Sequence, residues 1–331
     1  MRSLFLPCGM MLFSCKAGSR LNNQNTHKDT HNLLRLLKRH YMSVLSGLTG
    51  DKPRSYGFEY EFLPTRPLSI DDVAAVGGCL AKLGFASRKK DFIHPELGMC
   101  VSFEPGGQIE YCSPPLKSSD HHMFQNLLSL IQQTNAQIKS DLGIEYIGTD
   151  FLPGRESAPL CLTSERYRQL HARLSRVGSR GLEMMKGTAS IHLHVVISNF
   201  ANLLPLFNAL CELSVDKDFR MSWHRRHIWD HTDATRCGRP PCCFANLQTV
   251  DQLIHRLIGF ALRTEVLGED VPFAKVGDQS YEAFLNHMTT VFTDVRFNLK
   301  GPTLELRTLD SMPVSRFKLK WRKFILTMES F

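Results

Sequence analysis

Strict alternation of apolar and polar side chains marks several segments of this chain. Residues 57–62 read Gly-Phe-Glu-Tyr-Glu-Phe, so that the aromatic side chains recur at every second position. A period of two residues is typical of a strand with one buried face. The same kind of pattern predicts strands in three further segments, which are 99–111 (two short strands around Pro105-Gly106-Gly107), 189–198 and 304–309.

Apolar residues that recur every three or four positions predict the helices. In residues 119–142, the apolar side of such a helix includes Leu127, Leu128, Ile131 and Ile138. Six other helices are expected at 32–45, 70–83, 164–176, 203–213, 250–262 and 280–291. The segment 223–241, rich in Arg, His, Asp and Pro, is expected to be a loop, and the polar residues 16–31 are expected to be disordered.

Helices and strands follow one another without a regular βαβ rhythm and without a glycine-rich strand–helix turn. This order argues against a Rossmann fold and favours an α+β fold with an antiparallel sheet. A chain of 331 residues can bury one large core or two modest ones. We expect a basic, partly disordered N-terminal extension with a helix over residues 1–54, and a single catalytic domain over residues 55–331.

The positive charge of the chain is concentrated at its N-terminus. Residues 1–54 hold nine Lys or Arg against two Asp, which is +7 of the net charge of +8 and leaves +1 for the rest. A nucleic-acid-binding protein needs a basic face on its folded part. We therefore expect no nucleic-acid partner, and we expect residues 1–41 to be dispensable for activity.

Ten cysteines are scattered along the chain without a C-x-x-C pair, which favours free thiols in a reducing compartment and a cytoplasmic location. No apolar run approaches the roughly 18 residues of a membrane-spanning helix, so no membrane partner is expected.

The short apolar run 4–13 is interrupted by Pro7 and Gly9. We interpret it as an extension or as the product of an upstream start codon, with Met42 as an alternative start, rather than as an export signal.

Four of the predicted strands carry ionisable residues on one face and apolar residues on the other. Side chains two residues apart in a strand point to the same face. The pairs related in this way are Glu59 with Glu61, His192 with His194, and Glu305 with Arg307, while Glu110 lies on the fourth strand. One Glu-x-Glu strand alone is more often a solvated surface, but four such strands on one sheet would form a charged wall.

Such a wall requires a counter-ion. Two carboxylates about 7 Å apart repel each other by on the order of 2 kcal/mol at an effective dielectric constant near 20. Hard oxygen ligands suit Mg²⁺, and the presence of an imidazole makes Mn²⁺ acceptable as well. The pattern therefore predicts a divalent metal site on this face.

Five sequence blocks, taken together, resemble the glutamate–cysteine ligases of the plant and proteobacterial type. They occur in the family's order within residues 57–310. The blocks are Gly57–Phe62 (GFEYEF), Phe103–Glu110 (FEPGGQIE), Met185–His194 (MKGTASIHLH), Ile228–Gly238 (IWDHTDATRCG) and Leu304–Arg307 (LELR). The resemblance implies a glutamine-synthetase-like fold, in which a curved antiparallel sheet forms a funnel with helices on its outer face.

The resemblance also implies the roles of individual residues. Its metal ligands would be Glu59, Glu61, Glu110, His192 and Glu305. Arg307 would stabilise the transferring phosphoryl group, and Arg225 and Arg236 would hold phosphate or a substrate carboxylate, as suits the guanidinium group. Glu104 and Gln108 would shape the substrate pocket, and His194 would bind substrate or support a metal ligand.

The implied reaction is ATP-dependent ligation of glutamate to cysteine, which supplies γ-glutamylcysteine for glutathione, with ATP as co-substrate and Mg²⁺ or Mn²⁺ as cofactor. One alternative is a ligase that joins glutamate or another acid to a different amine. Another is a non-catalytic homologue that binds a nucleotide or a partner protein. The family commonly continues beyond its last E-x-R strand, so an end at Phe331 is expected to alter the substrate pocket or to require a partner in a homo-oligomer.

Overall fold

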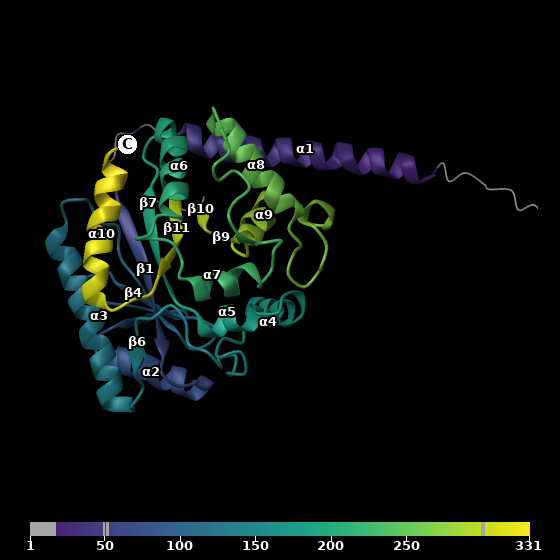
Figure 1. Cartoon of the computed structure of the whole chain (residues 1–331). Helices are drawn as coiled ribbons and strands as arrows, with labels where there is room; N and C mark the ends of the chain where they lie inside the picture. Colours follow the sequence, from purple (N-terminus) through teal and green to yellow (C-terminus); the bar gives the residue numbers. More distant parts are fainter. Residues whose placement is uncertain (1–17, 49, 51–52, 299–301) are drawn as a thin grey trace, which may run out of the picture.

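A large, open, antiparallel sheet dominates the computed structural model, which describes residues 18–48, 50, 53–298 and 302–331 (Figure 1). Eight strands follow the order β10-β11-β7-β1-β5-β4-β3-β2, and β6 pairs with β1 as the ninth. The strands are β1 (Tyr56–Pro64), β2 (Ala86–Arg88), β3 (Asp91–Ile93), β4 (Cys100–Phe103), β5 (Ile109–Cys112), β6 (Tyr146–Ile147), β7 (Ser190–Val196), β10 (Val295–Asn298) and β11 (Thr303–Asp310). A separate parallel pair joins β8 (Cys237–Gly238) to β9 (Phe292–Thr293).

Ten α-helices surround the sheet in the described part of the chain. They are α1 (Gly18–Ser46), α2 (Ile70–Lys82), α3 (His121–Leu142), α4 (Glu165–Val177), α5 (Gly181–Gly187), α6 (Leu203–Leu213), α7 (Trp223–Asp230), α8 (Val250–Arg263), α9 (Tyr281–Met288) and α10 (Val314–Glu329). The predicted α+β class with an antiparallel sheet is confirmed.

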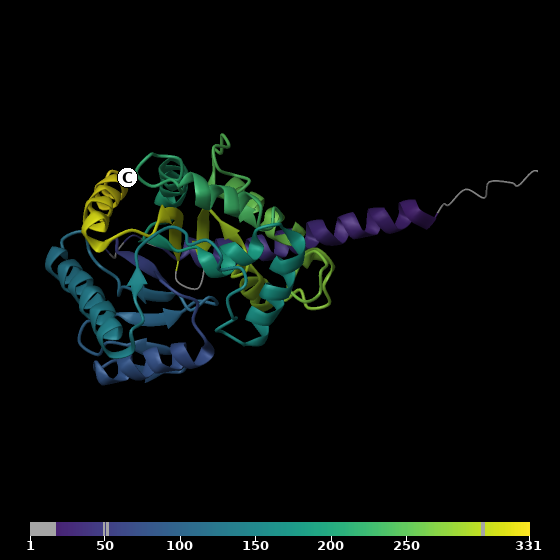
Figure 2. The same ribbon diagram turned by 60° about the horizontal axis from the view of Figure 1, so that its bottom comes forward.

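The apolar face of the sheet is covered by α3 and α10, which lie side by side in both views (Figures 1 and 2). The ring of Phe58 on β1 packs edge-on against Phe317 and Trp321 of α10, with ring centroids 5.4 and 5.7 Å away. Phe124 of α3 stacks on Trp321 at 5.0 Å. The aromatic positions of the alternating 57–62 pattern therefore anchor these helices.

Helix α1 differs from the expectation of disorder, since it begins at Gly18 rather than near residue 32; residues 16 and 17 lie outside the described part. Its first half projects from the body of the protein (Figure 1). Its second half lies beside α8 and buries four side chains in the main core, which are Leu33, Leu37, Tyr41 and Leu45. Part of the predicted extension thus belongs to the core, and we no longer expect residues 1–41 to be dispensable.

Several elements differ from the sequence-based expectations. The predicted loop 223–241 contains α7, which begins at the N-cap Ser222 and buries Ile228 and Trp229 among its charged residues. Helix α10 and strand β10 had no predicted counterpart. In α10 the buried residues nevertheless follow a helical period, at Val314, Phe317, Trp321, Phe324, Ile325 and Met328.

Two further observations concern the chain as a whole. Eight cysteines are free thiols, whereas Cys8 and Cys15 lie outside the described residues. Across residues 18–331, apart from the short gaps, no helix is both long and apolar enough to cross a membrane.

Candidate active site

The strand register gathers the predicted ligands on one face of the sheet. Glu59 of β1 lies opposite His192 of β7, and Glu61 lies opposite Glu110 of β5. In the β11–β7 pair, Glu305 lies opposite His194. Because residues directly opposite each other project to the same side of a sheet, the acidic and imidazole groups of four adjacent strands share one face.

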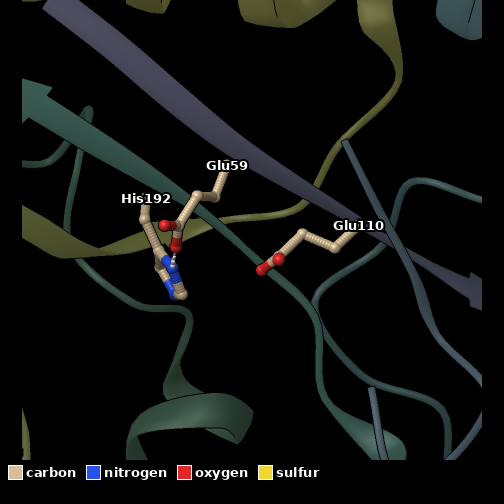
Figure 3. A group of neighbouring side chains, drawn as sticks. All are labelled: Glu59, Glu110 and His192. Atoms are coloured by element: carbon tan, nitrogen blue, oxygen red, sulfur yellow. Dashed lines mark hydrogen bonds and ion pairs between the residues drawn. The ribbon is translucent and has the colours of Figure 1, made fainter. Parts of the chain in front are cut away.

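Glu59 lies at the centre of this face. His192 Nδ1 is 2.7 Å from Glu59 Oε2, and the Glu110 carboxylate points toward the same space (Figure 3). The potential ligand atoms of Glu59, Glu110 and His192 all lie within 4.8 Å of one another. A second group whose potential ligand atoms also lie within 4.8 Å of one another consists of Glu59, His194 and Glu305. Glu59 therefore belongs to both groups found in the described residues.

Glu61 is tied to the start of β7. The backbone N–H and the hydroxyl of Ser190 donate to Glu61 Oε2 at 2.7 and 3.1 Å. Glu61 Oε1 is 3.8 Å from His192 Nε2. Glu61 thus adjoins the first group of ligands without being one of its three members.

Burial and neighbouring charges strongly shift the pKa values of the carboxyl groups on this face. Burial, followed by the charges of Glu61 and Glu59, raises the pKa of Glu104 to about 8. Burial and neighbouring carboxylates also raise the pKa of Glu110 well above its usual value. Burial would raise the pKa of Glu59 too, but the charge of His194 and the hydrogen bond from His192 hold it well below its usual value.

This donor set fits a divalent cation. The carboxylates of Glu59 and Glu110 converge with the imidazole of His192. Burial and neighbouring carboxylates disfavour the ionised forms of Glu110 and of the adjacent Glu104. A cation would relieve that repulsion, and an oxygen-rich set with some nitrogen suits Mg²⁺ or Mn²⁺.

Glu305 has a different environment, because two arginines neutralise it. Arg296 Nε donates to Glu305 Oε2 at 2.7 Å, and Arg307 Nη1 donates to Oε1. Burial opposes ionisation, but the two guanidinium charges outweigh it and lower the pKa of Glu305 to about 2. To ligate a metal, Glu305 would have to release one of these arginines, which could then bind another anion.

A cavity of about 260 Å³ lies over this face of the sheet. Helices α4, α5 and α7 contribute to its walls through residues such as Tyr167, Met185 and Trp229. The predicted site residues that line it are Glu59, Glu61, Glu104, Gln108, Glu110, His192 and Arg307.

The turn between β4 and β5 forms part of this cavity. Gln108 Oε1 accepts from the Gly106 N–H at 2.8 Å, and its amide donates to the carbonyls of Met185 and Thr188, each at 3.2 Å. A Cβ atom on Gly106 would lie 2.6 Å from the Lys186 carbonyl oxygen, so only glycine fits this close approach. Gln108 and Gly106 thus fix the turn against the end of α5.

Arg225 and Arg236 do not face the cavity, although they were predicted to hold phosphate or a substrate carboxylate there. Neither lines the cavity, and both are almost completely buried. Arg236 donates to Asp233, to both oxygens of Thr290 and to the carbonyl of Glu265. The donors of both residues hold protein groups in place, and the structure does not aim them at a phosphate or a substrate carboxylate.

Two arginines of the cavity had not been predicted from the sequence. Arg296 alternates with Val295 and Phe297 on β10, a pattern that could have revealed it if so short a strand had been considered. Arg166 lies on α4, where its N–H group donates to the carbonyl of Thr289 at 3.1 Å. No spacing signal distinguishes Arg166 from the other exposed arginines of that helix.

Comparisons with known proteins agree with the motifs. The profile described as Glutamate-cysteine ligase family 2 (GCS2) matches residues 55–212. The chain is 27% identical to the chloroplastic glutamate–cysteine ligases of Arabidopsis thaliana and Brassica juncea, and 26% identical to that of Nicotiana tabacum. These alignments cover 81% of this chain and 56%, 57% and 56% of the respective relatives.

The chain therefore spans little more than half the length of the curated relatives it matches. The matched profile contains the first three of the five sequence blocks, whose residues form β1, the β4–β5 turn and β7. The profile and the pairwise alignments both agree with the resemblance seen in the motifs, and this chain is similar to the glutamate–cysteine ligases.

Proposed function

We propose that this chain is an ATP-dependent glutamate–cysteine ligase that forms γ-glutamylcysteine through a γ-glutamyl phosphate. The observation that carries the proposal is the shared face of β5, β1, β7 and β11, where carboxylates, the His192 imidazole and Arg307 line one cavity. The similarity to named glutamate–cysteine ligases supports the choice of substrates.

The chemistry requires an electrophile made from a carboxylate. Transfer of the γ-phosphoryl group of ATP to the glutamate side chain creates a phosphate leaving group. The amine of cysteine then attacks the acyl carbon, the amide bond forms, and the bond to the phosphate oxygen breaks. Positioning and charge stabilisation account for most of the catalysis of phosphoryl transfer.

A divalent cation, Mg²⁺ or Mn²⁺, would be held by Glu59, Glu61, Glu110, His192 and Glu305, and would supply positive charge beside the phosphate oxygens. Arg307 is 8% exposed and lines the cavity, and its Nε has no hydrogen-bond partner. The part of its guanidinium that Glu305 does not engage would stabilise charge that develops on the transferring phosphoryl group. We assign Arg296 to hold Glu305 in its ionised state.

The assay that tests this function measures ADP release from ATP with glutamate and a panel of amines, with and without Mg²⁺. We expect metal-dependent ADP release that requires glutamate and is fastest with cysteine, together with equimolar γ-glutamylcysteine. ADP release that is fastest with another amine would reassign the acceptor. The absence of ADP release with every pair would reject the ligase function.

We infer a cytoplasmic location from the eight free thiols, which suit a reducing compartment. Thiol titration of the protein purified without reductant tests this inference. Disulfides among these eight residues would contradict it.

A further inference from the structure

A β-bulge lies where β11 carries Arg307. Leu306 pairs with Leu193 of β7, but the next pairs are Leu309 with Ile191 and Asp310 with Ser190. Three steps along β11 thus match two steps along β7, so Arg307 and Thr308 occupy the bulge. A bulge re-aims side chains and interrupts the regular ladder, so its backbone needs other partners to hold one conformation.

Arg225 of α7 provides those partners. Its Nη2 donates to the Arg307 carbonyl at 2.7 Å, and its Nη1 donates to the Thr308 carbonyl at 3.2 Å. The side chain is 1% exposed, and its charge is matched by Asp310, whose Oδ1 lies 2.8 Å from Nη1. One planar guanidinium therefore contacts both bulged residues and the carboxylate that follows them.

Helix α7 is fixed against the same end of β11. The Ser222 N–H donates to Asp310 Oδ2 at 2.7 Å, and the Ser222 hydroxyl caps α7 by accepting from the Arg225 N–H at 3.1 Å. The Arg225 guanidinium also lies 5.7 Å from the ring centre of Trp229, which lines the cavity. The buried guanidinium of Arg225 thus contacts both the bulge and Trp229 in one wall of the cavity.

We propose that Arg225 is a positioning residue, which holds the Arg307–Thr308 bulge and thereby keeps the Arg307 guanidinium directed into the cavity. This role rests on the function proposed above, in which Arg307 stabilises the transferring phosphoryl group. Arg225 itself contacts no substrate. It acts through the backbone of Arg307.

A double-mutant cycle of Arg225→Lys and Arg307→Lys tests the role. Lysine keeps the positive charge beside Asp310 but cannot reach both carbonyls with a planar fork. We expect Arg225→Lys to lower kcat by on the order of tenfold or more, as a misdirected catalytic group would, with a much smaller change in the KM for ATP. In the Arg307→Lys background, the same change should lower kcat by less than about twofold.

Arg155→Lys is the matched control. Arg155 is also buried and donates to two backbone carbonyls, those of Pro64 and Thr65, but it does not contact β11 or line the cavity. Its replacement should lower the melting temperature and change kcat by the same factor in both backgrounds. Equal losses of kcat from Arg225→Lys in the two backgrounds would overturn the positioning role.

A spectroscopic measurement keeps this test independent of the ligase function. The Nε–H signal of Arg307 in ¹⁵N NMR spectra can be assigned by its loss in Arg307→Lys. Arg225→Lys should shift this signal and Arg155→Lys should not. If the wild-type protein releases no ADP, the ligase function fails, while an unmoved Arg307 signal would reject the positioning role on its own.

Discussion

Glu59 lies directly opposite His192 across the β1–β7 pair, and its carboxylate oxygen is 2.7 Å from His192 Nδ1. Its other oxygen is 3.4 Å from His194 Nε2. One carboxylate thus faces two imidazoles that are two residues apart on the neighbouring strand. This geometry makes Glu59 the residue on which both groups of candidate ligands depend.

Replacement of Glu59 by Gln should therefore weaken divalent metal binding by on the order of 10- to 100-fold or more. Electron paramagnetic resonance of free Mn²⁺ in titrations measures the binding directly. The exposed Glu96→Gln serves as the control, since Glu96 lies outside both groups. Unchanged Mn²⁺ affinity in Glu59→Gln, or full ADP release in excess chelator, would contradict a metal site at Glu59.

Arg307→Lys should lower turnover by on the order of 10²-fold, the scale for loss of one preorganised charge-stabilising donor. The lysine keeps the charge but loses the planar donor geometry, so the affinities for ATP and metal should change much less. Steady-state kinetics with a metal titration separate these effects. Near-normal turnover in Arg307→Lys, matching that of the exposed Arg322→Lys, would remove Arg307 from the mechanism.

The second half of α1 offers a test of whether this segment contributes to the stability of the core. Leu37 is 1% exposed within the core and its neighbour Leu36 is 47% exposed. Leu37→Ala should lower the free energy of unfolding by about 2–5 kcal/mol, because it leaves a buried cavity. Leu36→Ala should change it by less than about 0.5 kcal/mol. Equal denaturation midpoints for the two variants would show that α1 is not part of the core.

The buried His287 should make the protein less stable in mild acid. Burial lowers the pKa of this imidazole to about 4, and its Nε2 is 3.0 Å from the carbonyl of Ala261. The unfolded chain takes up a proton near pH 6.5 and the folded chain does not, so stability is lost as the pH falls from about 6.5 to about 4. The full loss would be about 3 kcal/mol.

Urea denaturation at pH 7 and pH 5 of wild-type protein and His287→Gln measures this effect. The variant should lose less stability between the two pH values than wild type, whereas the exposed His122→Gln should behave as wild type. An identical pH dependence for all three proteins would show that His287 does not titrate as its burial requires.

The parts of the fold that follow a regular period could be predicted from the sequence. The alternation in β1 and β7 identified both the strands and the side chains that share a face, because side-chain direction in a strand depends only on position. The order of the strands, and hence the pairing of Glu59 with His192, depends on long-range packing. No local pattern contains that information.

The arginines show the same limit. Arg225, Arg236 and Arg307 have the same side chain, and composition alone makes each a candidate for binding phosphate. Only the backbone around them decides that Arg307 faces the cavity while the other two bind carbonyl groups. Helix α7 was not predicted because most of its residues are charged or polar, and only two apolar side chains, those of Ile228 and Trp229, are buried. Two positions are too few to show a helical period.

The close approach of Gly106 to α5 provides a criterion for comparing other chains that carry these blocks. The Cβ of any larger residue would meet two backbone atoms of Lys186, at 2.6 and 2.7 Å, and backbone cannot move aside as a flexible side chain can. A chain with alanine or serine at this position must separate the β4–β5 turn from α5 and displace Glu104 with it. Substitution of this single glycine is therefore a diagnostic of relatives that have kept the sheet but lost the geometry of its cavity.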